Sequence, residues 1–151
     1  MSALLDVNFL VALAWPNHIH HEVAVAWFEN NHERGWATCP LTQSGFVRVS
    51  SNQKIIAEAR SPREAIALLR QLTGLESHEF WADKIAIASS EYVDAVRIVG
   101  YRQVTDAHLL ALARDNGGKL VTFDRGIGNV CSEEIAAESL IVLSIDLSSS
   151  P

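Results

Sequence analysis

Short apolar runs alternate along this chain with longer segments whose apolar residues recur at helical spacing. Residues 3–6 read as a buried strand that ends in an acid, and residues 36–39, 119–123 and 140–143 have the same apolar character. A further strand is expected at residues 79–81. Runs of this length, bounded by polar or turn residues, are typical of strands buried on both faces of a sheet.

The segments between these runs carry the signals of helix starts and ends. Ser61-Pro62-Arg63-Glu64 combines a capping box with proline at the first helical position, so a helix is predicted from there to about Leu72. The other predicted helices run from the N-cap Asn8 to Trp15, over residues 21–32, from Thr42, over residues 91–99, and from the N-cap Thr105 to Gly117-Gly118.

Strands that alternate with helices predict an α/β fold, a three-layer α/β/α sandwich with a mainly parallel central sheet. The 151 residues fit one domain, which we place at residues 1–147, before a mobile Ser-rich tail at residues 148–151. In such a sheet, ligands bind beyond the carboxyl ends of the strands. Candidate chemistry is therefore expected at that edge.

Three acids are predicted to meet there. Asp6 ends the first strand, Asp124 follows the strand at residues 119–123, and Asp106 lies in the first turn of a late helix. Taken singly, Asp106 suits a helix dipole and Asp124 suits a turn before Gly126. Asp6 lies between apolar runs, with no Lys or Arg among the first 33 residues, so it calls for a cation or several hydrogen-bond donors.

A divalent cation removes the repulsion between clustered carboxylates, and oxygen ligands suit Mg²⁺ or Mn²⁺. Such an ion activates water and stabilises charge on a phosphodiester, as in metal-dependent nucleases. The net charge of −6 gives no overall basic footprint for nucleic acid, but half of the twelve Lys and Arg residues fall between Arg34 and Arg70. Nucleic-acid contacts would then be local, with Arg48 and Arg125 as the candidates.

Three motifs resemble those of the PIN-domain family: Leu4-Leu5-Asp6-Val7-Asn8, Thr105-Asp106-Ala107-His108-Leu109 and Val121-Thr122-Phe123-Asp124-Arg125. The whole chain resembles the VapC-type toxins of bacterial toxin–antitoxin pairs, over roughly residues 2–145. This resemblance implies a Mg²⁺- or Mn²⁺-dependent endoribonuclease that binds RNA, is inhibited by a small antitoxin, and forms a homodimer.

The resemblance also implies roles for single residues. The acidic metal-site residues would be Asp6, Asp106 and Asp124, of which Asp124 acts partly through water. The neighbours that orient these carboxylates by hydrogen bonds would be Asn8, Thr105 and Thr122.

Gln43 departs from the family pattern, in which a Glu commonly occupies the helix after the second strand. An amide oxygen still accepts hydrogen bonds or contacts a metal, but one negative charge is lost. We therefore expect one cation, or a weak site in the free protein, and keep Gln43 as a candidate catalytic residue. Its other interpretation is an ordinary polar residue in a first helical turn.

Two alternative functions stay open from the sequence. The loss of charge at Gln43 allows a catalytically weak or inactive PIN-like domain that acts as a protein-binding module. A phospho-acceptor signalling domain, modified on Asp6 or Asp124, is a more distant hypothesis.

The remaining chemistry-bearing residues are expected to serve the fold. Cys39 and Cys131 form no C-x-x-C pair and are expected as buried thiols in a reducing cytoplasm. The longest apolar run, residues 9–15, is too short to cross a bilayer, so no membrane role is expected. Three histidines match no zinc motif and are expected at the surface or in packing: His18, His20 and His21.

Overall fold

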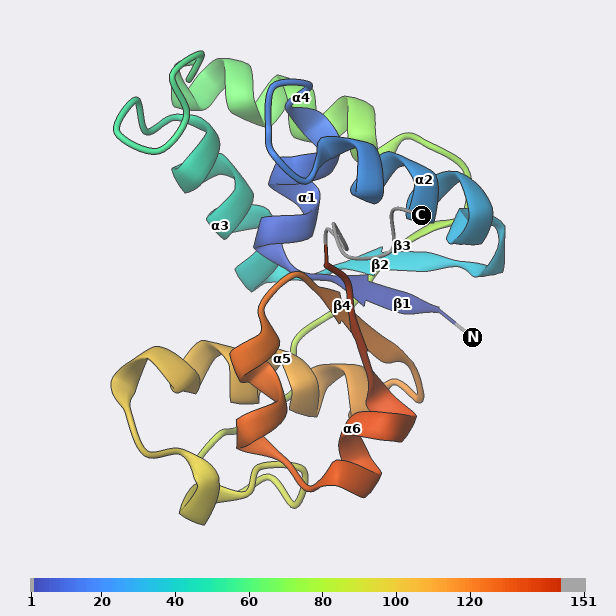
Figure 1. Cartoon of the computed structure of the whole chain (residues 1–151), viewed down its shortest axis with the longest axis vertical. Helices are drawn as coiled ribbons and strands as arrows, with labels where there is room; N and C mark the ends of the chain where they lie inside the picture. Colours follow the sequence, from blue (N-terminus) through green and yellow to red (C-terminus); the bar gives the residue numbers. More distant parts are fainter. Residues whose placement is uncertain (1, 145–151) are drawn as a thin grey trace, which may run out of the picture.

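A computed structural model of the chain describes residues 2–144, so the predicted tail and the end of the predicted domain lie outside the described residues. A five-stranded sheet of order β3-β2-β1-β4-β5 forms the middle layer (Figure 1). Every pairing in this sheet is parallel, which confirms the predicted α/β class. The strands are β1 (Ala3–Leu5), β2 (Trp36–Thr38), β3 (His78–Phe80), β4 (Lys119–Thr122) and β5 (Leu140–Val142).

Helices cover both faces of the sheet. In Figure 1, α1 to α4 lie above the sheet, and α5 and α6 lie below it. The helices are α1 (Val7–Ala14), α2 (His21–Asn31), α3 (Pro40–Ser50), α4 (Pro62–Thr73), α5 (Val104–Asp115) and α6 (Glu133–Ser139).

The central strand β1 divides the core between the two outer layers. Leu5 packs into the cluster that contains Phe9 and Phe46, on the side of α1 to α4. Leu4 packs into the cluster that contains Leu109, on the side of α5. Successive side chains of a strand point to opposite faces, so an uninterrupted apolar run is what a strand covered on both faces requires.

Three predicted helix starts are wrong by one to three residues. Asp6, and not Asn8, is the N-cap of α1, because its carboxylate accepts a hydrogen bond from the N–H of Val7. Helix α3 begins at Pro40 rather than Thr42, since proline fits the first helical turn without losing a needed donor. Helix α5 begins at Val104, so Thr105 lies within its first turn and does not cap it.

The predicted helix over residues 91–99 is also wrong. Within residues 91–99 only Ala95–Arg97 is helical, as one turn of 3₁₀-helix, and a second such turn at Tyr101–Gln103 precedes α5. Val96 and Val99 have helical spacing, but each is 90% exposed, so no apolar face is buried to hold a helix there. Conversely, the short α6 had no predicted counterpart; Ser132 caps it by accepting from the N–H of Ile135.

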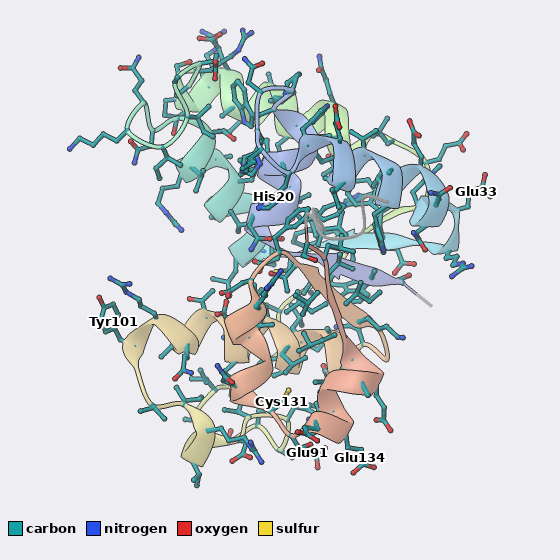
Figure 2. All side chains as sticks on the ribbon, viewed as in Figure 1. His20, Glu33, Glu91, Tyr101, Cys131 and Glu134 are labelled. Carbon is teal, nitrogen blue, oxygen red and sulfur yellow. The ribbon has the colours of Figure 1, made fainter. Side chains whose placement is uncertain are left out.

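Most of the remaining expectations about packing are confirmed. Both cysteines are free and buried. His21 contacts the carbonyl oxygen of Ala12 through Nδ1, and His20, labelled in Figure 2, stacks on Phe123 with ring centroids 4.4 Å apart. Within residues 2–144, no helix is long and apolar enough to cross a membrane.

Candidate functional site

Asp6 is fixed at the carboxyl end of the central strand. Its side chain is only 7% exposed. Oδ1 accepts a 2.7 Å hydrogen bond from the N–H of Val7, and Oδ2 accepts one of 2.7 Å from the hydroxyl of Thr122. Burial raises the pKa of Asp6 above its ordinary value, and the negative charge of Asp124 raises the pKa further, against the two donors.

Asp106 lies in the first turn of α5 and faces the same edge of the sheet. Its pKa is raised to about 7, first by partial burial and then by the negative charges of Asp6 and Asp124. A hydrogen bond with the side chain of Asp124 adds to this rise. The structure thus brings together the three acids that the sequence placed at one edge.

Thr122 and Asn8 link this cluster to the turn that carries Asp124. The Thr122 hydroxyl accepts from Nδ2 of Asn8 at 3.1 Å and from the N–H of Asp124 at 3.0 Å, besides donating to Asp6. Oδ1 of Asn8 accepts from the N–H of Phe123 at 3.2 Å. Thr122 and Asn8 therefore make hydrogen bonds of the kind that the resemblance to the PIN-domain family implied for them.

Thr105 does not share in this network. It is exposed in the first turn of α5, and within residues 2–144 its hydroxyl has no hydrogen bond to any of the three carboxylates. The orienting role expected for Thr105 therefore has no contact to support it in this structure.

Gln43 lies in the first turn of α3, after β2. Its Nε2 donates to the hydroxyl of Thr38 at 3.0 Å, and that hydroxyl also lies 2.8 Å from Nε2 of His78. This contact shows that Gln43 is held by specific partners and is not a freely solvated residue of a helical turn.

Thr38 and His78 are polar residues of this region that the sequence reading did not single out. Thr38 carries one recognisable signal: like Asp6 and Thr122, it is a polar residue at the carboxyl end of a buried strand. His78 carries no such signal, because its contact with Thr38 joins residues 40 positions apart.

The two arginines proposed to contact nucleic acid are exposed. Arg48 lies on α3, and Arg125 directly follows Asp124. Neither forms an ion pair within the described part of the chain, so both guanidinium groups are available to a phosphate. His108, two residues after Asp106 on α5, contacts Asp83 through Nε2 at 2.6 Å.

The chemistry of the cluster fits a hard divalent cation, since its donors are carboxylate oxygens whose mutual repulsion a cation would relieve. Within residues 2–144, however, no three His, Cys, Asp or Glu side chains are arranged to hold a metal ion as they stand. An arrangement with Asp6 and Asp106 as direct ligands and Asp124 acting through water is compatible with both facts.

Comparison with known proteins shows the family to which the chain belongs. The chain is similar to "Ribonuclease VapC38" of Mycobacterium tuberculosis, with 54% identity over 83% of this chain and 86% of that protein. It is also similar to "Ribonuclease VapC39" of the same species, with 46% identity over 87% of this chain and 95% of the relative.

Solved structures agree on the fold. The VapBC2 structure from Rickettsia felis, bound to a DNA fragment from its promoter, matches with a TM-score of 0.63 at 12% identity, over 94% of this chain and 98% of that chain. PAE2754 from Pyrobaculum aerophilum matches with a TM-score of 0.57 at 20% identity, over 93% and 83%. The PIN domain family model matches residues 3–133. With that match and relatives of 46% and 54% identity, this chain belongs to the PIN domain family.

Proposed function

We propose that this chain is a Mg²⁺- or Mn²⁺-dependent endoribonuclease, the toxin of a toxin–antitoxin pair, which hydrolyses RNA phosphodiester bonds. One observation carries the proposal: Asp6, Asp106 and Asp124 gather at the carboxyl edge of the sheet, where partial burial and then the charges of Asp6 and Asp124 raise the pKa of Asp106 to about 7. The names of the relatives VapC38 and VapC39, both ribonucleases, support the same activity.

The environment of each acid would determine its role in the reaction. Asp6, held by two donors, would keep one orientation and stay available as a ligand through its remaining lone pairs. Asp106 carries a proton part of the time near neutral pH and would release it when positive charge enters the cluster. Asp124, exposed at the rim, would hold water for the reaction. A bound Mg²⁺ or Mn²⁺ would supply an activated water and stabilise charge on the phosphodiester.

Substrate binding would rest on the exposed arginines beside this cluster. Arg48 on α3 and Arg125 next to Asp124 would contact phosphates that flank the scissile bond. Because the chain as a whole carries a net charge of −6, RNA affinity would depend on these local contacts and on the cation.

The alternative of an inactive protein-binding module is not favoured. Asp6, Asp106 and Asp124 are all present. Thr122 donates to Asp6 and accepts from the N–H of Asp124, and Asn8 donates to Thr122. Only the charge at Gln43 is missing, and the ribonucleases VapC38 and VapC39 share 54% and 46% identity with this chain.

We further propose a small antitoxin as a partner, a homodimeric state and a cytoplasmic location. The fold match to a VapBC complex supports the antitoxin, whose basic segment would suit the acidic edge. Exposed apolar residues before α5 support self-association. Val96 and Val99 are each 90% exposed, and Tyr101, labelled in Figure 2, is 81% exposed. The free, buried Cys39 and Cys131 suit a reducing compartment.

The test is cleavage by the purified chain, free of antitoxin, with Mg²⁺ or Mn²⁺ and with EDTA. We expect RNA cleavage that EDTA abolishes, and we expect Asp6→Ala and Asp106→Ala to lose activity while keeping a cooperative thermal transition. Asp115→Ala, at the far end of α5, is the matched control that should cleave like the parent. A parent that neither cleaves RNA nor binds a divalent ion would refute the proposal, and parental activity in either variant would refute the site.

A further inference from the structure

Gln43 borders the acidic edge through the register of the sheet. Leu4 of β1 lies beside Ala37 of β2, so the residues two positions further along, Asp6 and Cys39, leave the sheet at the same level. The backbone N–H of Gln43 donates to the carbonyl oxygen of Cys39 at 3.0 Å. Gln43 therefore lies one helical turn beyond the level at which Asp6 follows β1.

The two ends of an amide side chain have opposite hydrogen-bonding character. Beside three carboxylates, an NH₂ group would donate to one of them and compete with a cation for it. A carbonyl oxygen instead offers lone pairs, which suit a cation or a water that a cation holds. The orientation of the Gln43 amide therefore decides whether this residue weakens or supports a metal site.

The structure fixes that orientation through Thr38. Nε2 of Gln43 donates to the Thr38 hydroxyl at 3.0 Å, and Thr38 is fully buried at the end of β2. The same hydroxyl lies 2.8 Å from Nε2 of His78 on β3. The ring of His78 packs against the buried Trp36, with ring centroids 4.7 Å apart, which limits its movement.

The number of hydrogens available at the Thr38 hydroxyl explains why the Gln43 amide keeps this orientation. Burial lowers the pKa of His78, so its ring is neutral at neutral pH and can leave Nε2 without a hydrogen. In the tautomer of His78 that carries its hydrogen on Nδ1, which this orientation of Gln43 requires, Nε2 takes the single hydrogen of the Thr38 hydroxyl, and the hydroxyl lone pairs accept from Gln43. A reversed Gln43 would need the hydrogen that His78 already takes, so the two would compete for it.

We propose that Thr38 and His78 are positioning residues that hold the Gln43 amide with its carbonyl oxygen as the free end at the acidic edge. This inference rests on the proposed function, since it assigns Gln43 a supporting role in a cation-dependent site. It also gives a reason why an amide can occupy this position: a carboxylate has two equivalent oxygens and needs no such selection, whereas an amide does.

The difference between an amide and a carboxylate at position 43 can be tested by mutation. Thr38→Val keeps the shape of the side chain and removes the hydroxyl. In the parent we expect it to lower Mn²⁺ affinity, measured by calorimetry, and the RNA cleavage rate by about 10- to 100-fold, as loss of an outer contact to a metal site commonly does. In a Gln43→Glu background, Thr38→Val should lower Mn²⁺ affinity and the RNA cleavage rate by a several-fold smaller factor. Thr38→Ser, which keeps the hydroxyl, should restore nearly parental values.

Two controls separate positioning from packing. Thr73→Val, on α4, removes a hydroxyl that bonds only within its own helix and should change neither quantity. His78→Phe keeps a ring against Trp36 but frees the Thr38 hydrogen, so it should weaken Mn²⁺ binding in the parent and not with Glu at position 43. Equal losses from Thr38→Val in both backgrounds, or a Thr38→Ser as impaired as the valine variant, would overturn the inference.

A readout without metal or RNA distinguishes this inference from the proposed function. In nuclear magnetic resonance spectra, the side-chain NH₂ of Gln43 should be protected from exchange in the parent and unprotected in Thr38→Val. If that holds while the parent neither binds Mn²⁺ nor cleaves RNA, the function fails and the positioning stands. If the Gln43 NH₂ exchanges freely in the parent, the positioning is overturned whatever the activity.

Discussion

The hydroxyl of Thr122 donates a 2.7 Å hydrogen bond to Oδ2 of Asp6, joining two residues 116 positions apart in the sequence. The contact follows from the sheet, because β4 pairs directly with β1 and both strands end at the same edge. The same hydroxyl accepts from Asn8 and from the backbone of Asp124. One buried oxygen thus organises two of the three acids.

Thr122→Val should therefore harm both stability and activity. It removes one of the two donors to the buried Asp6 carboxylate, leaving only the N–H of Val7, and it removes an acceptor from Asn8 and Asp124. The expected cost is about 1–3 kcal/mol in the free energy of unfolding. Urea unfolding and RNA cleavage measure the two effects, and we expect at least about tenfold slower cleavage. Thr122→Ser should behave almost as the parent. A valine variant with parental cleavage would show that the hydroxyl is not needed.

The raised pKa of Asp106 predicts an unusual pH dependence for the metal-free protein. Between pH 3.8 and about 7 the folded state keeps a proton that the unfolded state has lost, so this group's contribution to stability falls as pH rises through that range. Asp106→Asn removes the effect. In EDTA at pH 8 the variant should be more stable than the parent by about 1–2 kcal/mol, after allowance for solvent screening.

Thermal melts at pH 4 and pH 8 check this expectation. The difference between Asp106→Asn and the parent should be much smaller at pH 4, where Asp106 is protonated in the folded state and still partly protonated in the unfolded state. Saturating Mn²⁺ should stabilise the parent and leave the variant little changed. Equal stability of the two proteins at pH 8 would mean that neither burial nor the charges of Asp6 and Asp124 destabilise the ionised Asp106 carboxylate.

Gln43→Glu should strengthen cation binding. It adds a fourth negative charge at the edge where three acids already meet, and we expect Mn²⁺ affinity to rise by about tenfold, or 1.4 kcal/mol. Isothermal titration calorimetry measures the change. Gln43→Ala is the comparison variant, which should bind Mn²⁺ more weakly than the parent. Unchanged affinity in both variants would place Gln43 outside the metal site.

Arg48→Ala and Arg125→Ala should each weaken RNA binding without altering Mn²⁺ affinity. Loss of one phosphate contact should reduce the slope of log affinity against log salt concentration by about 1. Fluorescence anisotropy with a short RNA, over a series of KCl concentrations, measures the slope. Arg60, which pairs with Glu64 on the exposed surface, offers a control in Arg60→Ala. A salt slope equal to that of the parent would exclude the arginine concerned from RNA contact.

Where local sequence and tertiary packing agree, the sequence predicted the structure well. The apolar runs at β1, β2 and β4 are buried as expected, whereas β5, at the edge of the sheet, is only partly buried. Ser61 caps α4 by accepting from the N–H of Glu64, as predicted. The meeting of Asp6, Asp106 and Asp124 was predictable because parallel strands end at a common edge, a rule that needs no distances.

What the sequence could not supply depends on distant partners. Asn8 and Asp6 are both good capping residues, and only the contact of Asn8 with Thr122 and Phe123 decides that Asp6 caps α1. A helix was predicted over residues 91–99, yet Val96 and Val99 within it are each 90% exposed and bury no apolar face. Gln43 on α3 bonds to Thr38 on β2, and Thr38 contacts His78 on β3. No local sequence pattern indicates these contacts, because they join three separate elements.

Because β1 lies in the middle of the sheet beside β4, the site can be completed only after both strands have been synthesised. Asp6 is made 116 residues before its partner Thr122, and Asp106 is also made before Thr122 and Asp124. A growing chain that has not yet reached β4 therefore carries the first two acids without the hydroxyl that orients Asp6 and without the third acid. The cluster assembles only when β4 pairs with β1, so its formation reports that the centre of the sheet has folded.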